Sequence, residues 1–409
     1  MNITQKSIVG LLLLVNAVMI LSGCTSAPPP STPLPPVQRS PSVSNTPNPF
    51  TKHPVSPAPP VPSNSAAPNK NRTAPILPEQ TRPTWIASSW NDLPGWNEES
   101  MPEVWDTLVH SCERPTTIFV RLCAQLRPLS LAEEGEQRLF LMTNLQPFKI
   151  VSASGETSGL LTGYFEPIFN ASRSKKPGFE TPLYAPTAEI LSLKSNHSKW
   201  YSRQEIETAP AVQEVLRGQE IAWMSDPLDV LILQIQGSGR LNITENDGSQ
   251  KWIKVIYAAS NELPYQSIGR YLLDHSEITD ASWPGIKSWA LKNPDKIKTL
   301  LWTNPRYVFF KEEPLESMSL GPKGAQGLEL TAGRSVAVDP QYINYGTPLW
   351  MVSEGPTLQL RRWVMAQDTG NAITGPLRAD YFVGTGLQAG DLAGHLRQPL
   401  NLWALLPRQ

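Results

Sequence analysis

The chain of 409 residues is poor in cysteine and histidine, two residue types that commonly bind metals, and it has no excess of positive charge. It has only three cysteines and five histidines. No two histidines stand at the spacing of a metal-binding pair, so we predict no metal site. The 35 basic and 36 acidic residues leave a net charge of −1 and form no basic block, which argues against a nucleic-acid partner. An uncharged polymer, or one that carries its own carboxylates, remains compatible with this balance.

Long apolar runs are scarce too, and the one that stands out lies at the N-terminus. Residues 8–20 are apolar apart from Gly10 and Asn16, and the sequence Leu-Ser-Gly-Cys follows at 21–24. This pattern resembles a bacterial lipobox and predicts a signal peptide over residues 1–23, with acylation of Cys24. The alternative is an ordinary cleaved signal. Thr25 follows in place of an Asp, which favours a lipid anchor in the outer membrane, facing the periplasm.

The next segment has almost no large apolar residues. Residues 24–83 consist mainly of Pro, Ser, Thr, Asn and Ala, so they cannot bury enough surface to offset the entropy of ordering. We predict a disordered, semi-extended tether that lets the folded part work at a distance from its membrane. The globular part then begins near residue 84.

Two cysteines, Cys112 and Cys123, fall within the globular part. In an oxidising compartment they could form a disulfide bond. Two separate buried thiols are the alternative, and the spacing does not decide between them.

Short apolar segments separated by Gly and Pro dominate the globular part and favour β-barrels over a doubly wound sheet. Helical periodicity is best at 118–144, and a second helix is expected at 267–274. We expect strands at 230–235, 252–257, 306–310, 335–338, 348–352 and 361–366.

Two carboxylates stand out near the C-terminus because both are embedded among glycines and apolar residues. Asp368 and Asp380 are twelve residues apart. Burial makes a carboxylate costly to ionise and raises its pKa, and a carboxyl group that stays protonated can donate its proton to a leaving group. The pattern therefore predicts a general acid in a groove.

Two shorter motifs suggest other chemistries and are rejected. Residues 368–370 read Asp-Thr-Gly, as in aspartic proteases, but those enzymes need two such carboxylates and this motif occurs once. Residues 384–389 match part of a dinucleotide fingerprint, but too little chain follows for the second strand and acidic residue that the fingerprint requires.

Two other segments have the residue types of a sugar-binding groove. Residues 234–241 combine Gln, Ser and Arg donors with glycines that allow close approach to the backbone. A β-bulge or turn with an exposed polar tip is the alternative. Residues 162–167 place Tyr164 and Phe165 beside a glycine, and such aromatics line sugar sites or fill cores. Glu166 is a possible second acid or a solvated strand end.

These motifs occur in an order that resembles the membrane-bound lytic murein transglycosylase A family. The residues that carry the resemblance lie at 163–167, 236–239, 257–261, 265–269, 304–310 and 368–394. The C-terminal part also resembles three-aspartate domains, through Asp339, Asp368 and Asp380.

The resemblance implies a mainly β fold with a few helices. A double-psi β-barrel domain at 84–164 plus 310–409 would be interrupted by a smaller, β-rich domain at 165–309, with the substrate groove between them.

The resemblance also implies an enzyme that cleaves the β-1,4 bond between N-acetylmuramic acid and N-acetylglucosamine in peptidoglycan. The muramic C6 hydroxyl attacks the anomeric carbon and leaves a 1,6-anhydro ring, without a cofactor. Asp380 matches the single general acid and base, with Asp368 as its neighbour. The expected substrate-binding residues are Tyr164, Gln236, Gly237, Ser238, Gly239, Arg240, Tyr257, Asn261, Thr369 and Gly370.

One residue departs from the family pattern. Asn371 replaces the second glycine of the loop after Asp368, and we expect the loop to survive because Asn tolerates left-handed backbone angles. A non-catalytic lipoprotein that binds peptidoglycan and tethers the membrane to the wall is the alternative function.

Overall fold

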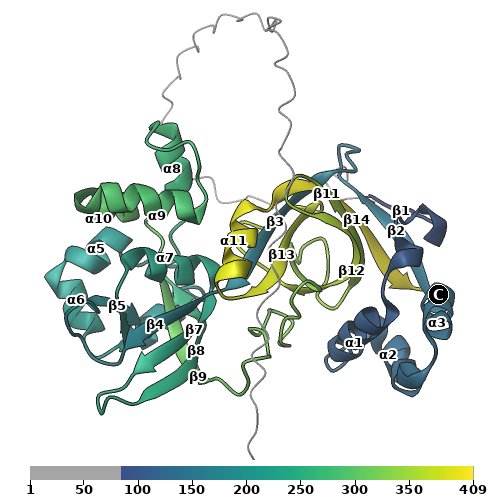
Figure 1. The fold of residues 1–409 in the computed structure, drawn as a ribbon, viewed down its shortest axis with the longest axis horizontal. Coiled ribbons are helices and arrows are strands. Elements are labelled where there is room, and N and C mark those ends of the chain that lie inside the picture. The colour runs from purple at the N-terminus through teal and green to yellow at the C-terminus, as the bar shows by residue number, and fades with distance from the viewer. Residues whose placement is uncertain (1–83, 409) are drawn as a thin grey trace, which may run out of the picture. The chain divides into compact units, whose positions relative to one another are not determined.

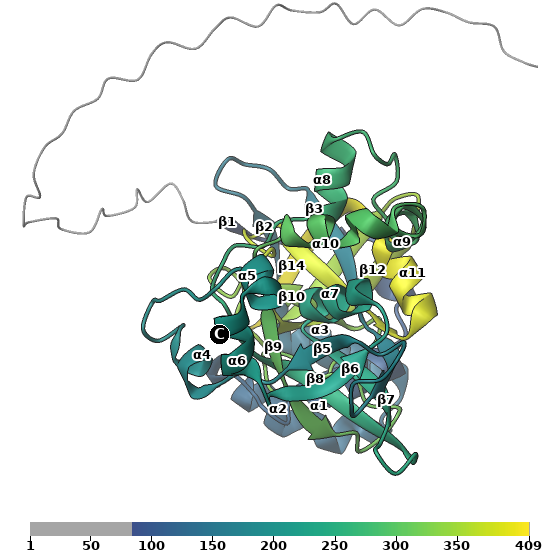
Figure 2. The ribbon, with the colours of Figure 1, turned by 90° about the vertical axis from the view of Figure 1, so that its left-hand side faces the viewer.

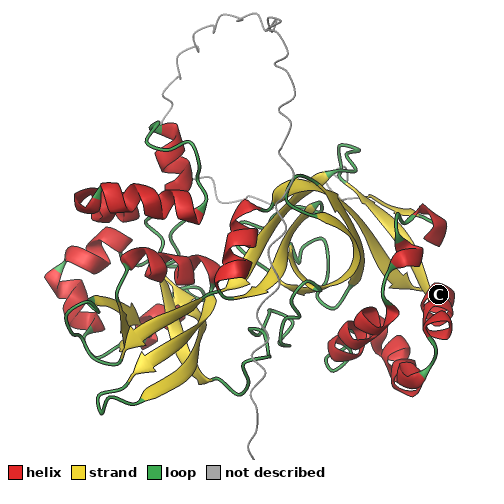
Figure 3. Cartoon of the chain, viewed as in Figure 1, coloured by secondary structure: helices red, strands yellow, loops and turns green. Residues whose placement is uncertain are grey.

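The computed structural model describes residues 84–408. The predictions for residues 1–23, Cys24 and the segment up to residue 83 lie outside these residues. Two β-sheets with surrounding helices make up the described chain (Figures 1 and 3). No helix among the described residues is long and apolar enough to span a bilayer.

The first sheet closes into a nearly complete barrel. Its spatial order is β1 (Thr84–Ala87), β2 (Leu145–Val151), β14 (Arg397–Pro407), β11 (Pro348–Glu354), β12 (Gln359–Asp368), β10 (Ser335–Val338), β13 (Arg378–Thr385) and β3 (Gly159–Glu166). An additional pairing of β14 with β3 closes the ring. Side chains that alternate along these strands fill the interior, including Val336, Val364 and Tyr381.

The second sheet is inserted between β3 and β10. Its spatial order is β5 (Thr181–Tyr184), β6 (Glu220–Met224), β4 (Ile168–Ser172), β7 (Ser238–Thr244), β8 (Gln250–Ser260) and β9 (Val308–Pro314). Because its strands span 168–314, we propose that the inserted domain ends near residue 314, slightly beyond the boundary of 309 suggested by the sequence.

Helices flank both sheets (Figure 2). Those beside the barrel are α1 (Met101–Ser111), α2 (Val120–Leu126), α3 (Glu134–Asn144) and α11 (Leu387–His395). Those of the inserted segment are α4 (Ala188–Ser192), α5 (Arg203–Thr208), α6 (Pro210–Leu216), α7 (Pro227–Gln236), α8 (Ile268–Asp274), α9 (Trp283–Lys292) and α10 (Ile297–Trp302). The helices expected at 118–144 and 267–274 are confirmed, and Ser267 caps the latter through its side chain.

The strand expected at 230–235 is wrong, because this run lies inside helix α7. Asp226 caps the helix through its side chain, Pro227 occupies the first turn, and Gly237 ends the helix at φ 76°. Nearly every residue of the run is buried. A fully buried apolar run has no polar face that would show its period, so the sequence pattern cannot separate a strand from a helix.

Cys112 and Cys123 form a disulfide bond that ties the end of α1 to α2. The bond closes a loop between residues separated by eleven positions. We expect a Cys112→Ser/Cys123→Ser double variant to lose about 2–3 kcal/mol of unfolding free energy, because the unfolded chain regains loop entropy. Denaturant unfolding checks this. Reductant should lower the wild-type midpoint to that of the variant, and equal midpoints for the two proteins without reductant would contradict it.

Candidate active site

Asp380 lies on the outer face of the barrel. Its neighbours on β13, Ala379 and Tyr381, point into the barrel interior. Because successive side chains on a strand alternate between faces, Asp380 points outward. Asp380 pairs with Ala337 of β10 on one side and with Thr162 of β3 on the other.

A register shift brings Asp368 onto the same face. Along β12, Ala366 pairs with Val336, but the next residue of β10, Ala337, pairs with Asp368. The extra residue on β12 turns Asp368 outward, as a β-bulge does. Ala337 therefore lies between Asp368 and Asp380 in the strand order. Its small side chain is buried there.

One oxygen of the Asp380 carboxyl is held by a short chain of hydrogen bonds. Thr162 donates its hydroxyl proton to Oδ1 of Asp380, and Arg378 donates from Nη2 to the Thr162 hydroxyl at 2.8 Å. Because Arg378 occupies the acceptor side of that hydroxyl, the Thr162 proton is directed at Asp380. Within residues 84–408, Oδ2 of Asp380 has no hydrogen-bond partner. This oxygen is not fully buried, although most of the side chain is.

The surroundings of Asp380 favour a protonated carboxyl. Burial raises its pKa above the usual range. The Thr162 hydrogen bond and the Arg378 charge act in the opposite direction, and the Asp368 charge raises the pKa further. Burial is the largest of these influences, so the carboxyl holds its proton at a higher pH than an exposed aspartate.

Asp368 is fixed by two donors from distant parts of the chain. Tyr164 donates its hydroxyl to Oδ2 at 2.9 Å, and the backbone N–H of Ala325 donates to Oδ1 at 3.1 Å. Burial raises the pKa of Asp368, while these hydrogen bonds lower it. Burial and the neighbouring carboxylates raise the pKa of Tyr164 well above its usual value, so Tyr164 remains a hydrogen-bond donor.

Several predicted binding residues lie at the end of α7 and the adjoining strands of the second sheet. Gln236 accepts a hydrogen bond from the backbone N–H of Phe165 at 3.1 Å, next to Tyr164. Gly237 accepts one from the Tyr257 backbone at 2.7 Å. Ser238 is half-buried, and the Tyr257 side chain is 42% exposed. These residues are therefore close to each other and available at the surface.

Two other predicted binding residues are not available. Arg240 is 2% exposed and ion-paired with Glu166, which is fully buried. Asn261 is fully buried and bonds the backbone of Tyr201 and Pro305. The structure does not support direct substrate contact for either side chain, and Glu166 is neither a solvated strand end nor an exposed acid.

Gly239 has a packing role, because a Cβ there would lie 2.2 Å from Leu233. The hydrophobic core of the second sheet, not a ligand, requires this glycine.

The loop after Asp368 differs from expectation at Asn371. Among the described residues, the positive φ in this loop falls on Gly375, at 95°, and not on Asn371. Asp339 accepts a hydrogen bond from the Gly375 N–H at 2.7 Å and so fixes this turn. Thr369 donates to the Val338 carbonyl at 3.0 Å, and Gly370 is half-buried beside it. Asn371 therefore fits without strain.

Sequence reasoning missed Thr162, Arg378, Ala337 and Ala325. Thr162 and Arg378 share a strand face with residues that the motifs had singled out, so period-2 alternation could have indicated both. Ala337 and Ala325 depend on strand order and on a loop contact, for which the sequence has no local signal. Among residues 84–408, no cluster of three or more His, Cys, Asp or Glu side chains could hold a metal ion.

Two segments of the chain match described protein families. Residues 160–311 match the MltA specific insert domain, and residues 334–406 match the 3D domain. The first match covers most of the second sheet, and the second covers β10 to β14 with both aspartates.

Solved and curated proteins are similar over most of the described chain. The lytic transglycosylase LtgG of Burkholderia pseudomallei is 37% identical, with a TM-score of 0.56, over 80% of this chain and 96% of that one. MltA from Neisseria gonorrhoeae is 27% identical, with a TM-score of 0.66, over 80% and 93%. The membrane-bound lytic murein transglycosylase A of Vibrio cholerae is 28% identical over 288 residues, which cover 67% of this chain and 72% of that protein.

Proposed function

Because this chain belongs to the MltA family of lytic transglycosylases, enzymes that act on peptidoglycan, we propose that it cuts glycan strands without water. The proposed bond is the β-1,4 link between N-acetylmuramic acid and N-acetylglucosamine, and the muramic C6 hydroxyl is the proposed nucleophile. The observation that carries this proposal is the environment of Asp380. One oxygen is held by Thr162 and the other is open, on a carboxyl whose pKa burial raises.

In the first step, Asp380 acts as a general acid. Because Oδ1 accepts the Thr162 proton, the acid proton belongs on Oδ2. Oδ2 donates that proton to the glycosidic oxygen as the bond to the anomeric carbon breaks. The carboxylate that forms is stabilised by Thr162 and by the charge of Arg378.

In the second step, the same carboxylate acts as a base. It accepts the proton of the C6 hydroxyl while the C6 oxygen bonds to the anomeric carbon, which closes the 1,6-anhydro ring and restores the acid. A second catalytic carboxylate is unnecessary, because the nucleophile is already part of the substrate and has a high effective concentration. Ordinary glycosidases, which recruit water, need a pair of carboxyl groups.

We propose that the glycan runs past the end of α7 and the loop after Asp368. Gln236, Gly237, Ser238 and Tyr257 offer polar atoms and an exposed aromatic face to sugar rings. Thr369 and Gly370 lie on the other side, next to Asp368.

The N-terminal segment supports a proposal about location. Cleavage before Cys24 and acylation of its thiol would anchor the enzyme to the outer membrane, and residues 24–83 would let it reach the peptidoglycan.

Digestion of purified sacculi tests the function. We expect soluble muropeptides with 1,6-anhydro ends, identified by mass spectrometry. Binding to sacculi without release of such products would support the non-catalytic tether. Products with reducing muramic ends would indicate hydrolysis by water.

The Thr162→Val variant tests the hydrogen bond to Asp380. Because Thr162 lowers the pKa of Asp380, its loss should raise that pKa. The alkaline limb of the pH–rate profile, where the acid loses its proton, should then move to higher pH. The profile of kcat/KM on soluble glycan strands measures this shift. A limb that stays in place, or that moves to lower pH, would contradict the assigned hydrogen bond.

A further inference from the structure

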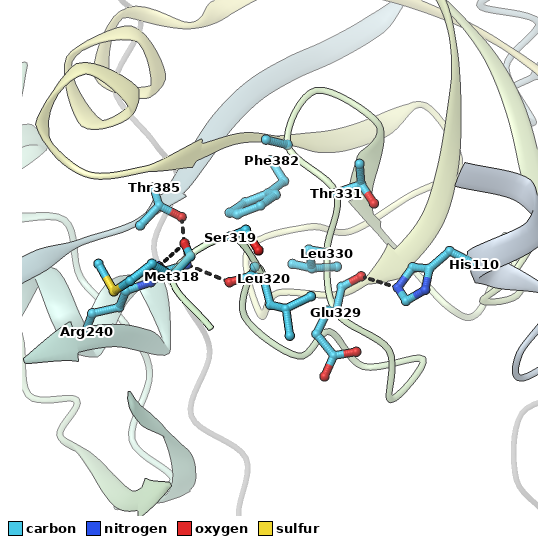
Figure 4. A pocket seen from close by; sticks show the side chains of 12 residues that line it. His110, Arg240, Met318, Ser319, Leu320, Glu329, Leu330, Thr331, Phe382 and Thr385 are labelled. Atoms are coloured by element: carbon cyan, nitrogen blue, oxygen red, sulfur yellow. Dashed lines mark hydrogen bonds between the residues drawn. The ribbon is translucent and has the colours of Figure 1, made fainter. Parts of the chain in front are cut away.

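The chain passes between the two sheets at two places. The first crossing joins β3 to β4 and contains Glu166 at the end of β3. The second crossing is the segment 315–334, between β9 and β10. A side chain of the second sheet, Arg240 on β7, contacts both crossings, through Glu166 and Met318. Figure 4 shows Arg240 beside Met318 of the second crossing.

All three nitrogens of the Arg240 guanidinium donate hydrogen bonds. Nε and Nη2 bind Glu166 Oε2 at 2.7 and 2.6 Å. Nη1 donates to the Met318 carbonyl and Nη2 to the Leu320 carbonyl, both at 2.6 Å. The Thr385 hydroxyl, at the end of β13, donates to Glu166 Oε2 at 3.1 Å. One buried charge therefore joins the inserted sheet to the barrel and to both connecting segments.

The second crossing continues directly to the active site. A neighbouring side chain of the inserted sheet, Lys254, donates to the Gly321 carbonyl at 2.8 Å. The segment then folds back on itself, because the Leu330 N–H donates to the Pro322 carbonyl at 2.8 Å. At the tip of this turn, the Ala325 N–H donates to Asp368.

We propose that Arg240 is a positioning residue, which holds the segment 318–330 so that Ala325 stays bonded to Asp368. The inference deepens the proposed function and rests on it. It gives the arginine of the predicted sugar-binding motif a role that requires no contact with sugar. In this arrangement the inserted domain fixes the position of Asp368, beside Asp380. It does so through one ion pair and through a short loop that is closed by a hydrogen bond between its own residues.

A cavity of about 430 Å³ lies beside this segment and is lined by residues of both sheets, including Arg240, Phe382 and Thr385 (Figure 4). The cavity means that the segment 318–332 is not packed solidly on this side. Met318 and Leu320 are largely exposed, so the hydrogen bonds of Arg240 and Lys254, and not apolar packing, hold residues 318–321. Further along the segment, Leu328 and Leu330 are buried.

The test removes both charges of the ion pair together. Removing one partner of a buried pair leaves the other charge unpaired and is strongly destabilising, whereas replacing both is often neutral. A Glu166→Gln/Arg240→Met double variant should therefore fold while losing the bonds to Met318 and Leu320. Arg173→Met is the matched control, because Arg173 pairs with Glu245 and Glu312 inside the inserted sheet and contacts neither crossing.

Hydrogen–deuterium exchange and steady-state kinetics on the full chain give two readouts. In the double variant, amides of 318–330 should exchange faster than in the wild type. Catalytic groups displaced by about 1 Å lose up to about 100-fold in rate, so we expect kcat to fall by about tenfold or more with KM nearly unchanged. In Arg173→Met, both the exchange of 318–330 and kcat should match the wild type. Lys254→Met removes only the bond to Gly321 and should give a smaller change in the same direction.

Two results would overturn the inference. One is faster exchange at 318–330 with an unchanged kcat. The other is a raised KM without any change in exchange, which would assign Arg240 to substrate binding. If the wild type releases no anhydro products, the proposed function fails. The exchange experiment still tests whether Arg240 holds the segment.

Discussion

We expect the Asp380→Asn variant to release anhydromuropeptides at least about 1,000-fold more slowly than the wild type. General acid–base catalysis contributes a factor of about 10²–10⁴ to the rate, and here one group serves as the acid in the first step and the base in the second. Asparagine has the shape of aspartate and still offers an oxygen to Thr162, so the site should keep its form. It cannot donate an acidic proton to the glycosidic oxygen. The initial rate of product release from sacculi measures the effect.

Unfolding experiments separate this loss from misfolding. Because burial raises the pKa of Asp380 in the folded chain, ionisation of this group costs stability as the pH rises through that pKa. Asparagine removes the cost, so Asp380→Asn should be at least as stable as the wild type at neutral pH. Asp391→Asn, at an exposed aspartate of α11, should leave the rate unchanged. An active Asp380→Asn variant would contradict the assignment of the acid.

The second large effect is expected for Asp368→Asn, with a rate about 100-fold below the wild type. Both oxygens of Asp368 accept hydrogen bonds, from Tyr164 and from Ala325. An asparagine must turn its NH₂ group toward one of these donors, so one side of the site has to move. Product release at the optimal pH of the variant measures the loss.

The pH dependence of Asp368→Asn should also change. The charge of Asp368 raises the pKa of Asp380, so its removal lowers that pKa. The alkaline limb of the profile should move to lower pH, opposite to the shift expected for Thr162→Val. The ratio of the wild-type rate to the variant rate should be smaller at low pH, where Asp380 is protonated in both proteins. A limb that does not move would mean that the two carboxylates do not interact.

The sequence was sufficient to find the two aspartates and the family, because the residues that carry chemistry lie in short, ordered motifs. The barrel strands at 335–338, 348–352 and 361–366 are confirmed within β10, β11 and β12, since these apolar segments are short and turn residues separate them. The segment 230–235 was misread because five of its six residues are buried, so it shows no polar face of helical period.

The roles of individual polar residues were less predictable. An arginine beside glycines suggests a ligand site, but the partner of Arg240 is a buried glutamate 74 positions away along the chain. The same limit applies to Ala325, whose backbone bonds an aspartate 43 positions away. Such contacts follow from strand order and from the register shift on β12, and neither has a local sequence signal.

In the proposed mechanism, Asp380 carries a proton in the pH range where the enzyme works, and a direct titration tests this. In protein labelled with ¹³C at the aspartate carboxyl carbons, the resonance that disappears in Asp380→Asn belongs to this group. We predict a pKa above that of an exposed aspartate, coinciding with the alkaline limb of kcat/KM. A resonance that reports an ionised carboxylate throughout the pH range of full activity would contradict the mechanism.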